Sequence, residues 1–250
     1  MDVFSTPAIV LRVRDTDTAD RLAVLLTPAR GRLVCAAKNA RRSFKRFGGC
    51  LTLFAEIQAE AVAIEDREIA RLESAVLLEP FEGIRRGWRP LAVAAAGTEL
   101  VDRIAHGAEE APALYAEMRA FLAATADPLA DAARTLSAFE LRVLALAGFR
   151  PELDLCVRCG RGVTRKAVTR TFDVHRGGLV CPACVAKHPS PGRRDRVLAI
   201  SDAARAALAA MLAGAAPPDI PAKVHAECAG LVNALITERL GAPLKTWSVR

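Results

Sequence analysis

The stretch AAKNARRSFKRFGGCLTLFAEIQAEAVAIE, residues 36–65, joins a strongly basic segment to a segment that alternates between apolar and polar residues. Its first half holds five cations and two phenylalanines but no acidic residue, and it ends at Gly48 and Gly49. Alternation with a period of two is typical of a β-strand with one buried face. We therefore expect a basic loop that leads directly into a strand.

The residues on both sides of this loop also have the character of short strands. Pro28–Gly31 is a hairpin signal between two apolar segments. Short strands without helices between them predict a small antiparallel barrel. The segment 68–79 fits either a strand or a helix, and we take it as the fifth strand. The predicted strands cover residues 6–15, 20–27, 31–38, 50–65 and 68–79.

Beyond Pro80 the apolar residues follow the i, i+3, i+4 spacing of helices. The sequence therefore predicts an α+β multidomain fold, in which a small N-terminal antiparallel β-barrel is followed by an α-helical domain with an inserted zinc-binding segment. The expected domains are the barrel at 1–80, the helical domain at 81–150 and 189–250, and the insertion at 151–188. The predicted helices cover residues 89–107, 111–126, 127–149, 201–214 and 221–240.

Four of the seven cysteines form two C-x-x-C pairs, Cys156 with Cys159 and Cys181 with Cys184. Each pair places two thiolates on one tight turn, and 21 residues separate the two pairs. Two such turns that face each other make a tetrahedral site of four sulfur atoms, the closed geometry of structural zinc. We therefore predict one structural Zn²⁺ ion held by these four residues, with iron as the alternative metal.

Other roles for these residues were weighed. His175 and His188 lie close enough in sequence to replace a thiolate. A redox C-x-x-C pair is expected singly in a βαβ unit, and disulfides are uncommon in a reducing compartment. The remaining cysteines, Cys35, Cys50 and Cys228, are expected to be small buried apolar residues.

The second candidate site is the basic loop, defined as residues 30–46. It carries seven cations and no acid, so the net charge of +7 is locally concentrated. Lys and Arg neutralise phosphates, and an aromatic ring stacks on an unpaired base. Phe47, directly before two glycines, fits a core position equally well. The residues predicted to bind nucleic acid are Arg30, Arg32, Lys38, Arg41, Arg42, Phe44, Lys45 and Arg46.

No catalytic motif is found in the sequence, and we expect a protein that is not an enzyme. There is no P-loop, no G-x-G-x-x-G and no G-x-S-x-G. The sequence His225-Ala226-Glu227 matches part of a zinc-deaminase motif, but it follows the C-x-x-C pairs instead of preceding them. The acidic residues Asp15, Asp17 and Asp20 fit a solvated turn better than a metal site.

Taken together, these features resemble the RecO family of bacterial DNA-repair proteins. Three stretches carry the resemblance: AKNARRSFKRFGGCLTLF at 37–54, LRVLALAGFRPELDLCVRCG at 141–160, and the C-terminal LKT at 244–246. The resemblance implies an OB-fold, a helical part that surrounds a zinc-binding insertion, and no bond-breaking activity. It implies the zinc role for the four cysteines, and DNA binding for the basic loop as a region.

The resemblance also implies partners. Proteins of this family bind single- and double-stranded DNA and anneal complementary strands. Together with the ring-forming protein RecR, they help the recombinase RecA to replace single-strand binding protein (SSB), and they contact the acidic C-terminal tail of SSB. The implied role is that of a recombination mediator of the RecF pathway, in the cytoplasm at the nucleoid.

Alternatives remain at this stage. The barrel and zinc segment also fit an RNA-binding module of transcription or translation, or a scaffold for protein contacts. A metal-dependent enzyme would need an open metal site. Arg193, Arg194 and Arg196 either extend the DNA path or belong to a solvated linker. No apolar run reaches the roughly 18–20 residues that span a bilayer. No signal peptide is apparent, so we expect neither a membrane partner nor a small-molecule substrate.

Overall fold

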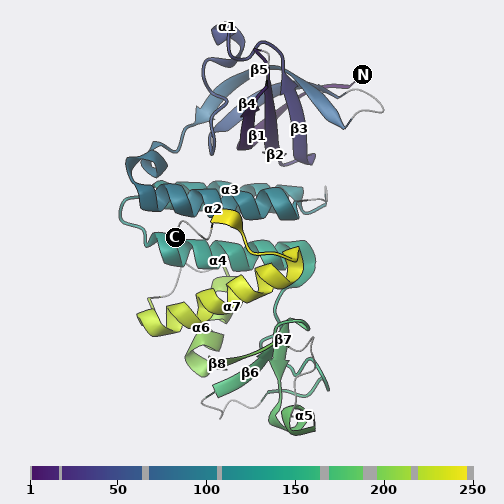
Figure 1. Ribbon diagram of the computed structural model, residues 1–250, viewed down its shortest axis with the longest axis vertical. Coiled ribbons are helices and arrows are strands. Elements are labelled where there is room, and N and C mark those ends of the chain that lie inside the picture. The colour runs from purple at the N-terminus through teal and green to yellow at the C-terminus, as the bar shows by residue number, and fades with distance from the viewer. Residues whose placement is uncertain are drawn as a thin grey trace. The chain divides into compact units, whose positions relative to one another are not determined.

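Figure 1 shows the computed structural model, which describes residues 2–16, 19–63, 68–105, 109–163, 169–187, 196–214 and 219–246. The chain divides into two compact units, Met1–Ala132 with Ser248–Arg250, and Ala133–Trp247. The three-part domain division expected from the sequence remains a prediction.

The first unit begins with a closed five-stranded barrel whose strand order is β1-β2-β3-β5-β4. Neighbouring strands are antiparallel, except that β3 and β5 run parallel. A partly Greek-key barrel of five strands is the OB-fold that the family resemblance implied, and the ambiguous segment 68–79 is indeed a strand. The strands are β1 (Asp2–Asp15), β2 (Arg21–Thr27), β3 (Gly31–Ala37), β4 (Glu56–Ala63) and β5 (Ile69–Glu79).

The barrel core is built from the inward-facing side chains of these strands. Leu25, Cys35, Ile57 and Leu72 are completely buried in one cluster. They lie inside because successive side chains of a strand point to opposite faces, so every second apolar residue is directed inward. Phe47, the last residue of the short helix α1 (Phe44–Phe47), adds its ring to the same cluster and is only 2% exposed. Its predicted core position is therefore confirmed.

Two helices lie side by side at one end of the barrel (Figure 1). The 3₁₀ segment η1 (Glu82–Arg86) leads into α2 (Trp88–Ile104), and α3 (Ala111–Ala126) follows. Both helices were predicted from the sequence. The predicted end of the first helix at Gly107 lies outside the described residues.

Two carboxylates join these helices to the barrel. The side chain of Asp102 on α2 is 6% exposed and accepts hydrogen bonds from two barrel arginines, Arg12 and Arg32, the latter at 2.8 Å. Glu56 on β4 accepts a 2.6 Å hydrogen bond from the Tyr115 hydroxyl and two from Arg119, both on α3. Buried charge is tolerated only when it is paired in this way, so each helix has a fixed partner on the barrel.

The second unit contains the helices α4 (Ala132–Leu144), α6 (Asp202–Leu212) and α7 (Ala222–Leu240), with the π-helical segment η2 (Ala145–Phe149) after α4. Helix α4 was expected to begin at Asp127 but begins at Ala132. The reason is a turn, in which the Asp127 carboxylate accepts a 2.9 Å hydrogen bond from the backbone N–H of Leu129. The other helices begin and end close to the predicted residues.

A three-stranded sheet of order β7-β6-β8 completes the second unit. Strands β6 (Thr169–Asp173) and β7 (Gly178–Val180) form a hairpin between the two C-x-x-C pairs, with Gly177 at a φ of 69° in the turn. The short helix α5 (Pro182–Lys187) follows. Strand β8 (Val197–Ser201) was not predicted, because four apolar residues directly before a helix signal are too short a pattern to assign. It pairs antiparallel with the other edge of β6.

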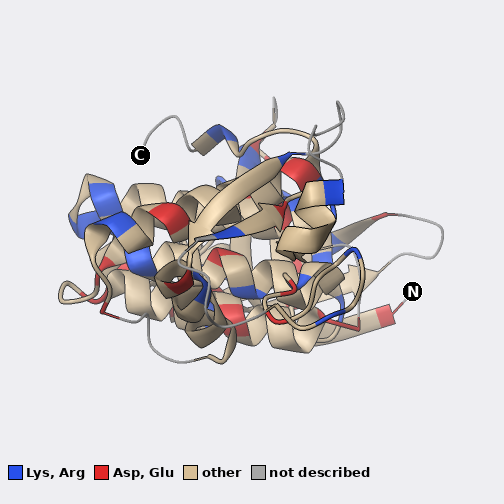
Figure 2. Ribbon diagram, turned by 90° about the horizontal axis from the view of Figure 1, so that it is seen from below, with Lys and Arg blue, Asp and Glu red and all other residues tan. Residues whose placement is uncertain are grey.

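Lys and Arg are distributed over both units and are interspersed with Asp and Glu, as the blue and red segments of Figure 2 show. Bulk charge therefore does not mark a binding surface, and the candidate site must be found from the pairing of individual cations. Within the described ranges, no helix is both long enough and apolar enough to cross a membrane.

The substitution Asp102→Ala tests whether the buried carboxylate fixes α2 to the barrel. Breaking a fully buried ion pair costs about 3–5 kcal/mol. Because Arg12 and Arg32 are partly exposed, we expect a loss of about 2 kcal/mol in the free energy of unfolding. Urea denaturation measures it. The matched control is Glu99→Ala on the same helix, which breaks the partly exposed Glu99–Arg103 pair and should cost under about 1 kcal/mol. Equal losses for the two variants would contradict the assignment.

Candidate functional site

The four cysteines of the two C-x-x-C pairs lie together in the second unit. Their sulfur atoms are all within 4.8 Å of one another, and the Sγ atoms of Cys159 and Cys181 are 3.7 Å apart. Four sulfurs bound to one ion at about 2.3 Å in a tetrahedron are separated by about 3.8 Å. The group of Cys156, Cys159, Cys181 and Cys184, called the cysteine cluster below, can therefore hold a metal ion.

Backbone hydrogen bonds place the two cysteine turns against each other. The first turn closes through a 2.8 Å bond from the N–H of Gly160 to the carbonyl of Cys156, and Gly160 has a φ of 71°. The second turn opens α5. The N–H of Cys181 donates to the Sγ of Cys156 at 3.3 Å, and that of Val157 donates to the carbonyl of Leu179 at 2.9 Å. The hairpin thus carries the second pair to the first.

The thiols of the cysteine cluster differ in their pKa values. Burial opposes ionisation of Cys156, but backbone N–H groups of Cys181, Arg158 and Cys159 outweigh it and lower the pKa of its thiol to about 6. Hydrogen bonds with the thiols of Cys159 and Cys181 raise the pKa of Cys184 to about 12. Four thiolates so close together repel one another, and a bound dication offsets that repulsion. The donor set therefore fits a cation.

The histidines that were weighed as alternative ligands are placed as follows. The Nδ1 atom of His175 is 2.7 Å from the Oε1 atom of Glu238 on α7, and His175 is not part of the cysteine cluster. His188 lies outside the described residues. Arg193 and Arg194, which with Arg196 were considered as an extension of the DNA path, also lie outside them. The other three cysteines, Cys35, Cys50 and Cys228, are at most 5% exposed, so their predicted burial is confirmed.

Three cations of the basic loop have structural partners within the first unit. Arg30 pairs with Asp2, and its guanidinium lies 4.0 Å from the centre of the Phe4 ring. Arg32 pairs with the buried Asp102. Burial, and then the charge of the neighbouring Arg12, lowers the pKa of Arg32. Lys38 pairs with the Asp20 carboxylate at 2.8 Å.

Two further arginines hold the loop in shape. Arg46 donates to the backbone carbonyl of Lys38 and, at 3.1 Å, to the hydroxyl of Ser43. Its guanidinium also lies 5.0 Å from the centre of the Phe47 ring. Arg41 lies 3.7 Å from the carboxylate of Asp15. The acidic turn thus serves as a partner for the loop; Asp17 lies outside the described residues.

The remaining members of the predicted set are Arg42, Phe44 and Lys45, called the exposed tip below. All three are exposed, and the Phe44 ring is 81% accessible to solvent. Within the described ranges, the side chains of Arg42 and Lys45 have no hydrogen-bond or ion-pair partner. Of the eight predicted residues, these three are available to a ligand without breaking an existing contact.

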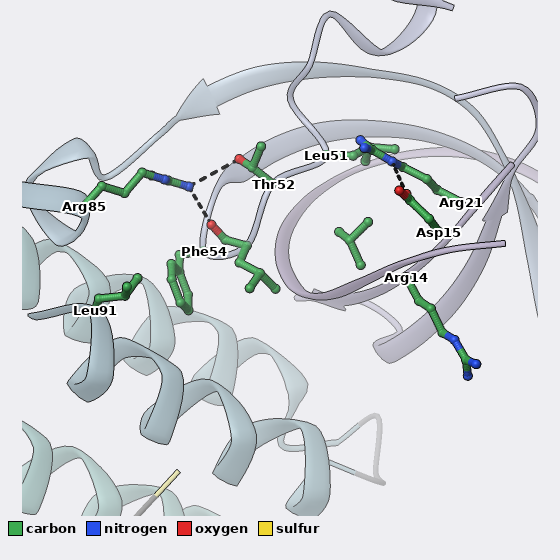
Figure 3. A pocket seen from close by; sticks show the side chains of 10 residues that line it. Arg14, Asp15, Arg21, Leu51, Thr52, Phe54, Arg85 and Leu91 are labelled. Carbon is green, nitrogen blue, oxygen red and sulfur yellow. Dashed lines mark hydrogen bonds and ion pairs between the residues drawn. The ribbon is translucent and has the colours of Figure 1, made fainter. Parts of the chain in front are cut away.

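Beside the loop the first unit has an open pocket of about 650 Å³, called the hollow below. Arg85 donates a 3.3 Å hydrogen bond to the Thr52 hydroxyl, toward which it points in Figure 3. It also donates a 2.8 Å hydrogen bond to the backbone carbonyl of Leu53. Sequence reasoning missed this pocket because its lining comes from five distant segments. A usable signal was the run IRRGWRP at 84–90, which interleaves arginines with an aromatic residue. The lining residues are Val13, Arg14, Asp15, Arg21, Leu51, Thr52, Leu53, Phe54, Arg85 and Leu91.

The barrel, its cationic loop and the cysteine cluster define a two-unit OB-fold protein with a candidate metal centre. The chain matches the family descriptions "Recombination protein O N terminal" over residues 1–81 and "Recombination protein O C terminal" over residues 85–248. The chain belongs to the RecO family, which confirms the resemblance found from the sequence.

Curated relatives agree with this membership over most of the chain. A DNA repair protein RecO of Anaeromyxobacter sp. (strain Fw109-5) is 34% identical over 236 residues, covering 94% of this chain and 91% of the relative. The DNA repair protein RecO of Myxococcus xanthus is 32% identical over 247 residues, covering 98% and 96%. That of Symbiobacterium thermophilum is 32% identical over 184 residues, covering 74% and 72%.

The two phenylalanines of α1 are predicted to differ in what they contribute. Phe47→Ala removes a buried ring and should lower the free energy of unfolding by about 3–5 kcal/mol. Phe44→Ala removes an exposed ring and should change it by no more than about 0.5 kcal/mol. Chemical denaturation followed by circular dichroism measures both. A large loss for Phe44→Ala would mean that this ring is structural and is not available for stacking.

Proposed function

We propose that this chain is a mediator of DNA repair and recombination that binds single- and double-stranded DNA and anneals complementary strands. In this proposal it acts with RecR to help load RecA onto DNA coated with SSB. The observation that carries it is the exposed tip, where two unpaired cations flank an exposed aromatic ring on the barrel of a RecO-family chain.

The chemistry of the exposed tip suits binding without sequence readout. Cations that have no protein partner neutralise phosphates and release counterions, whatever the base sequence. The Phe44 ring offers a face on which any base can stack. Annealing also requires that the repulsion between two polyanions be screened on one surface. The proposed DNA-binding region is the basic loop, with the exposed tip making the contacts and the other five cations holding the loop in place.

For the cysteine cluster we propose one structural Zn²⁺ ion, bound by Cys156, Cys159, Cys181 and Cys184. A zinc ion with four thiolate ligands has no open coordination position, so its contribution is to folding. The two cysteine turns would then be tied together at the end of the β6–β7 hairpin. The further partners proposed are RecR and the acidic C-terminal tail of SSB, in the cytoplasm at the nucleoid.

The decisive test of DNA binding is annealing of complementary oligonucleotides, naked and SSB-coated, by the wild type and by the double variant Arg42→Ala/Lys45→Ala. We expect the variant to anneal at least about tenfold more slowly. Its salt dependence on single strands should be flatter by about 1.4, because each lost phosphate contact removes about 0.7 from the slope. Neither substitution breaks an intramolecular pair, so the fold should be unchanged.

The matched control is Arg150→Ala/Lys223→Ala, which removes one Arg and one Lys from exposed positions of the second unit and should anneal like the wild type. An unchanged salt slope in the Arg42→Ala/Lys45→Ala variant would contradict the proposed contacts. A wild type that binds RNA oligonucleotides but does not anneal DNA would favour the RNA-binding alternative instead.

Metal removal gives a separate prediction. The wild type should contain one zinc ion per chain, measured by elemental analysis. Cys159→Ser/Cys184→Ser should contain almost none. We expect this double variant to lose about 2–3 kcal/mol in its free energy of unfolding, because metal binding stabilises the folded second unit. A loss of that size lowers the melting temperature of a unit of this size by roughly 10 °C. The control Cys228→Ala changes a buried cysteine outside the cluster and should keep its zinc. Iron in place of zinc, or full zinc content in the double variant, would contradict the assignment.

A further inference from the structure

A second aromatic and cationic group lies at the start of α2, on the first unit. Trp88 is the first residue of that helix, and its ring is 66% exposed. Arg86 and Arg89 flank it in sequence and are exposed. The guanidinium of Arg89 is 5.6 Å from the centre of the Trp88 ring. These three residues are called the tryptophan patch below.

The cations of the tryptophan patch are not used by the fold. In the part of the chain that the structure describes, neither Arg86 nor Arg89 has an acidic partner. The first turn of α2 contains no acidic residue, and a helix N-terminus adds partial positive charge. The contacts within the fold therefore do not explain why an exposed indole and two unpaired guanidinium groups lie together at this surface.

The hollow connects the tryptophan patch with the basic loop. Leu91, which lines the hollow, is three residues after Trp88, so the two side chains lie on the same face of α2. At the opposite rim, Asp15 pairs with Arg21 at 2.8 Å and lies 3.7 Å from Arg41 of the basic loop. Figure 3 shows Leu91 and Arg85 on one side of the hollow and Asp15 with Arg21 on the other. The surface from loop to helix is thus continuous.

Most of the charged side chains along this surface are cationic. Arg85 is held rigidly by its bonds to Thr52 and Leu53, whereas Arg14 points away from the hollow into solvent (Figure 3). The one carboxylate among the lining residues, Asp15, is neutralised by its arginine partners. A row of cations from the exposed tip to the tryptophan patch matches the repeated negative charge of a linear polyanion.

We propose that the tryptophan patch is a second contact for single-stranded DNA, in which one unpaired base stacks on Trp88 while Arg86 and Arg89 bind the adjacent phosphates. The strand runs from the basic loop across the hollow to the start of α2. The inference rests on the proposed DNA-binding function and extends it to residues outside the basic loop.

An acidic peptide is the competing ligand, and three observations favour DNA over it. A peptide side chain needs an enclosed apolar socket, whereas the apolar rim of the hollow is open, with Leu53 and Leu91 44% and 45% exposed. The Trp88 ring also stands at the surface as a flat face, which suits a base. The cations are spread along a path and are not gathered at one point.

Intrinsic fluorescence provides a direct test, because the chain has only two tryptophans. In a Trp247→Phe background, the signal reports on Trp88 alone. We expect a 20-nucleotide oligo(dT) to quench it in a saturable way, with the quenching relieved by salt. In anisotropy titrations with the same labelled oligo(dT), Trp88→Ala should bind roughly five- to tenfold more weakly. Trp88→Phe, which keeps an aromatic face, should stay within about twofold of the wild type.

Arg86→Ala/Arg89→Ala should also weaken binding and flatten the salt slope by about 1.4. The control Leu129→Ala removes an apolar side chain that is 92% exposed, and it should bind like the wild type. Melting temperatures of all variants should match that of the wild type, since the substituted side chains are exposed.

The outcomes separate this inference from the proposed function. If the wild type binds oligo(dT) and Arg42→Ala/Lys45→Ala weakens it, but Trp88 is not quenched and Trp88→Ala binds normally, the second contact is wrong and the proposed function stands. If the wild type binds no DNA, both fail. If an acidic peptide containing one phenylalanine changes Trp88 fluorescence at lower concentrations than oligo(dT), the patch is a peptide site and the inference is overturned.

Discussion

The pairing of two carboxylates, Asp102 and Glu56, with guanidinium groups is the interaction on which the architecture of the first unit depends. Asp102 joins α2 to the barrel, and Glu56 joins the barrel to α3. Such pairing is obligatory, because a carboxylate removed from water and left without a partner is strongly destabilising. It therefore holds the end of α2 and the middle of α3 against the barrel. It also commits Arg12, Arg32 and Arg119 to the fold.

Because these arginines are paired within the fold, the number of cations in a segment does not by itself identify a binding surface. By composition, every cation of the basic loop is an equal candidate for a phosphate contact. In the structure, five of the eight predicted residues already have partners, and the exposed tip holds the other three. A ligand that recruits Arg42 or Lys45 breaks nothing, whereas recruiting Arg32 would leave Asp102 with one partner fewer. Whether a cation lacks an intramolecular partner is thus a better guide to the proposed DNA-binding surface than the local density of charge.

The sequence predicted the parts of the structure that depend on local pattern. Period-two alternation located the fourth strand, which begins at Glu56 and not at Cys50 as predicted. Short apolar segments and turn signals located the others, and the spacing of two C-x-x-C pairs predicted the cysteine cluster. Phe47 was weighed correctly as a core residue because glycines follow it. Contacts between distant residues were not predictable in this way: Arg32 and Asp102 are 70 positions apart, and the hollow draws on five separate segments. Strand β8 was missed because its pattern is short and a helix signal follows it directly.

Strand β8 has a consequence for how the segment around the cysteine cluster is held. Strand β6 is paired on both edges, with β7 on one side and β8 on the other. The buried Arg170 of β6 also binds Asp202, the first residue of α6, at 2.9 Å. The sheet is thus anchored to a helix by contacts that involve no cysteine. The attachment of the sheet to α6 therefore does not depend on the cysteine cluster, and the sheet keeps this anchor whether or not the four sulfurs carry an ion.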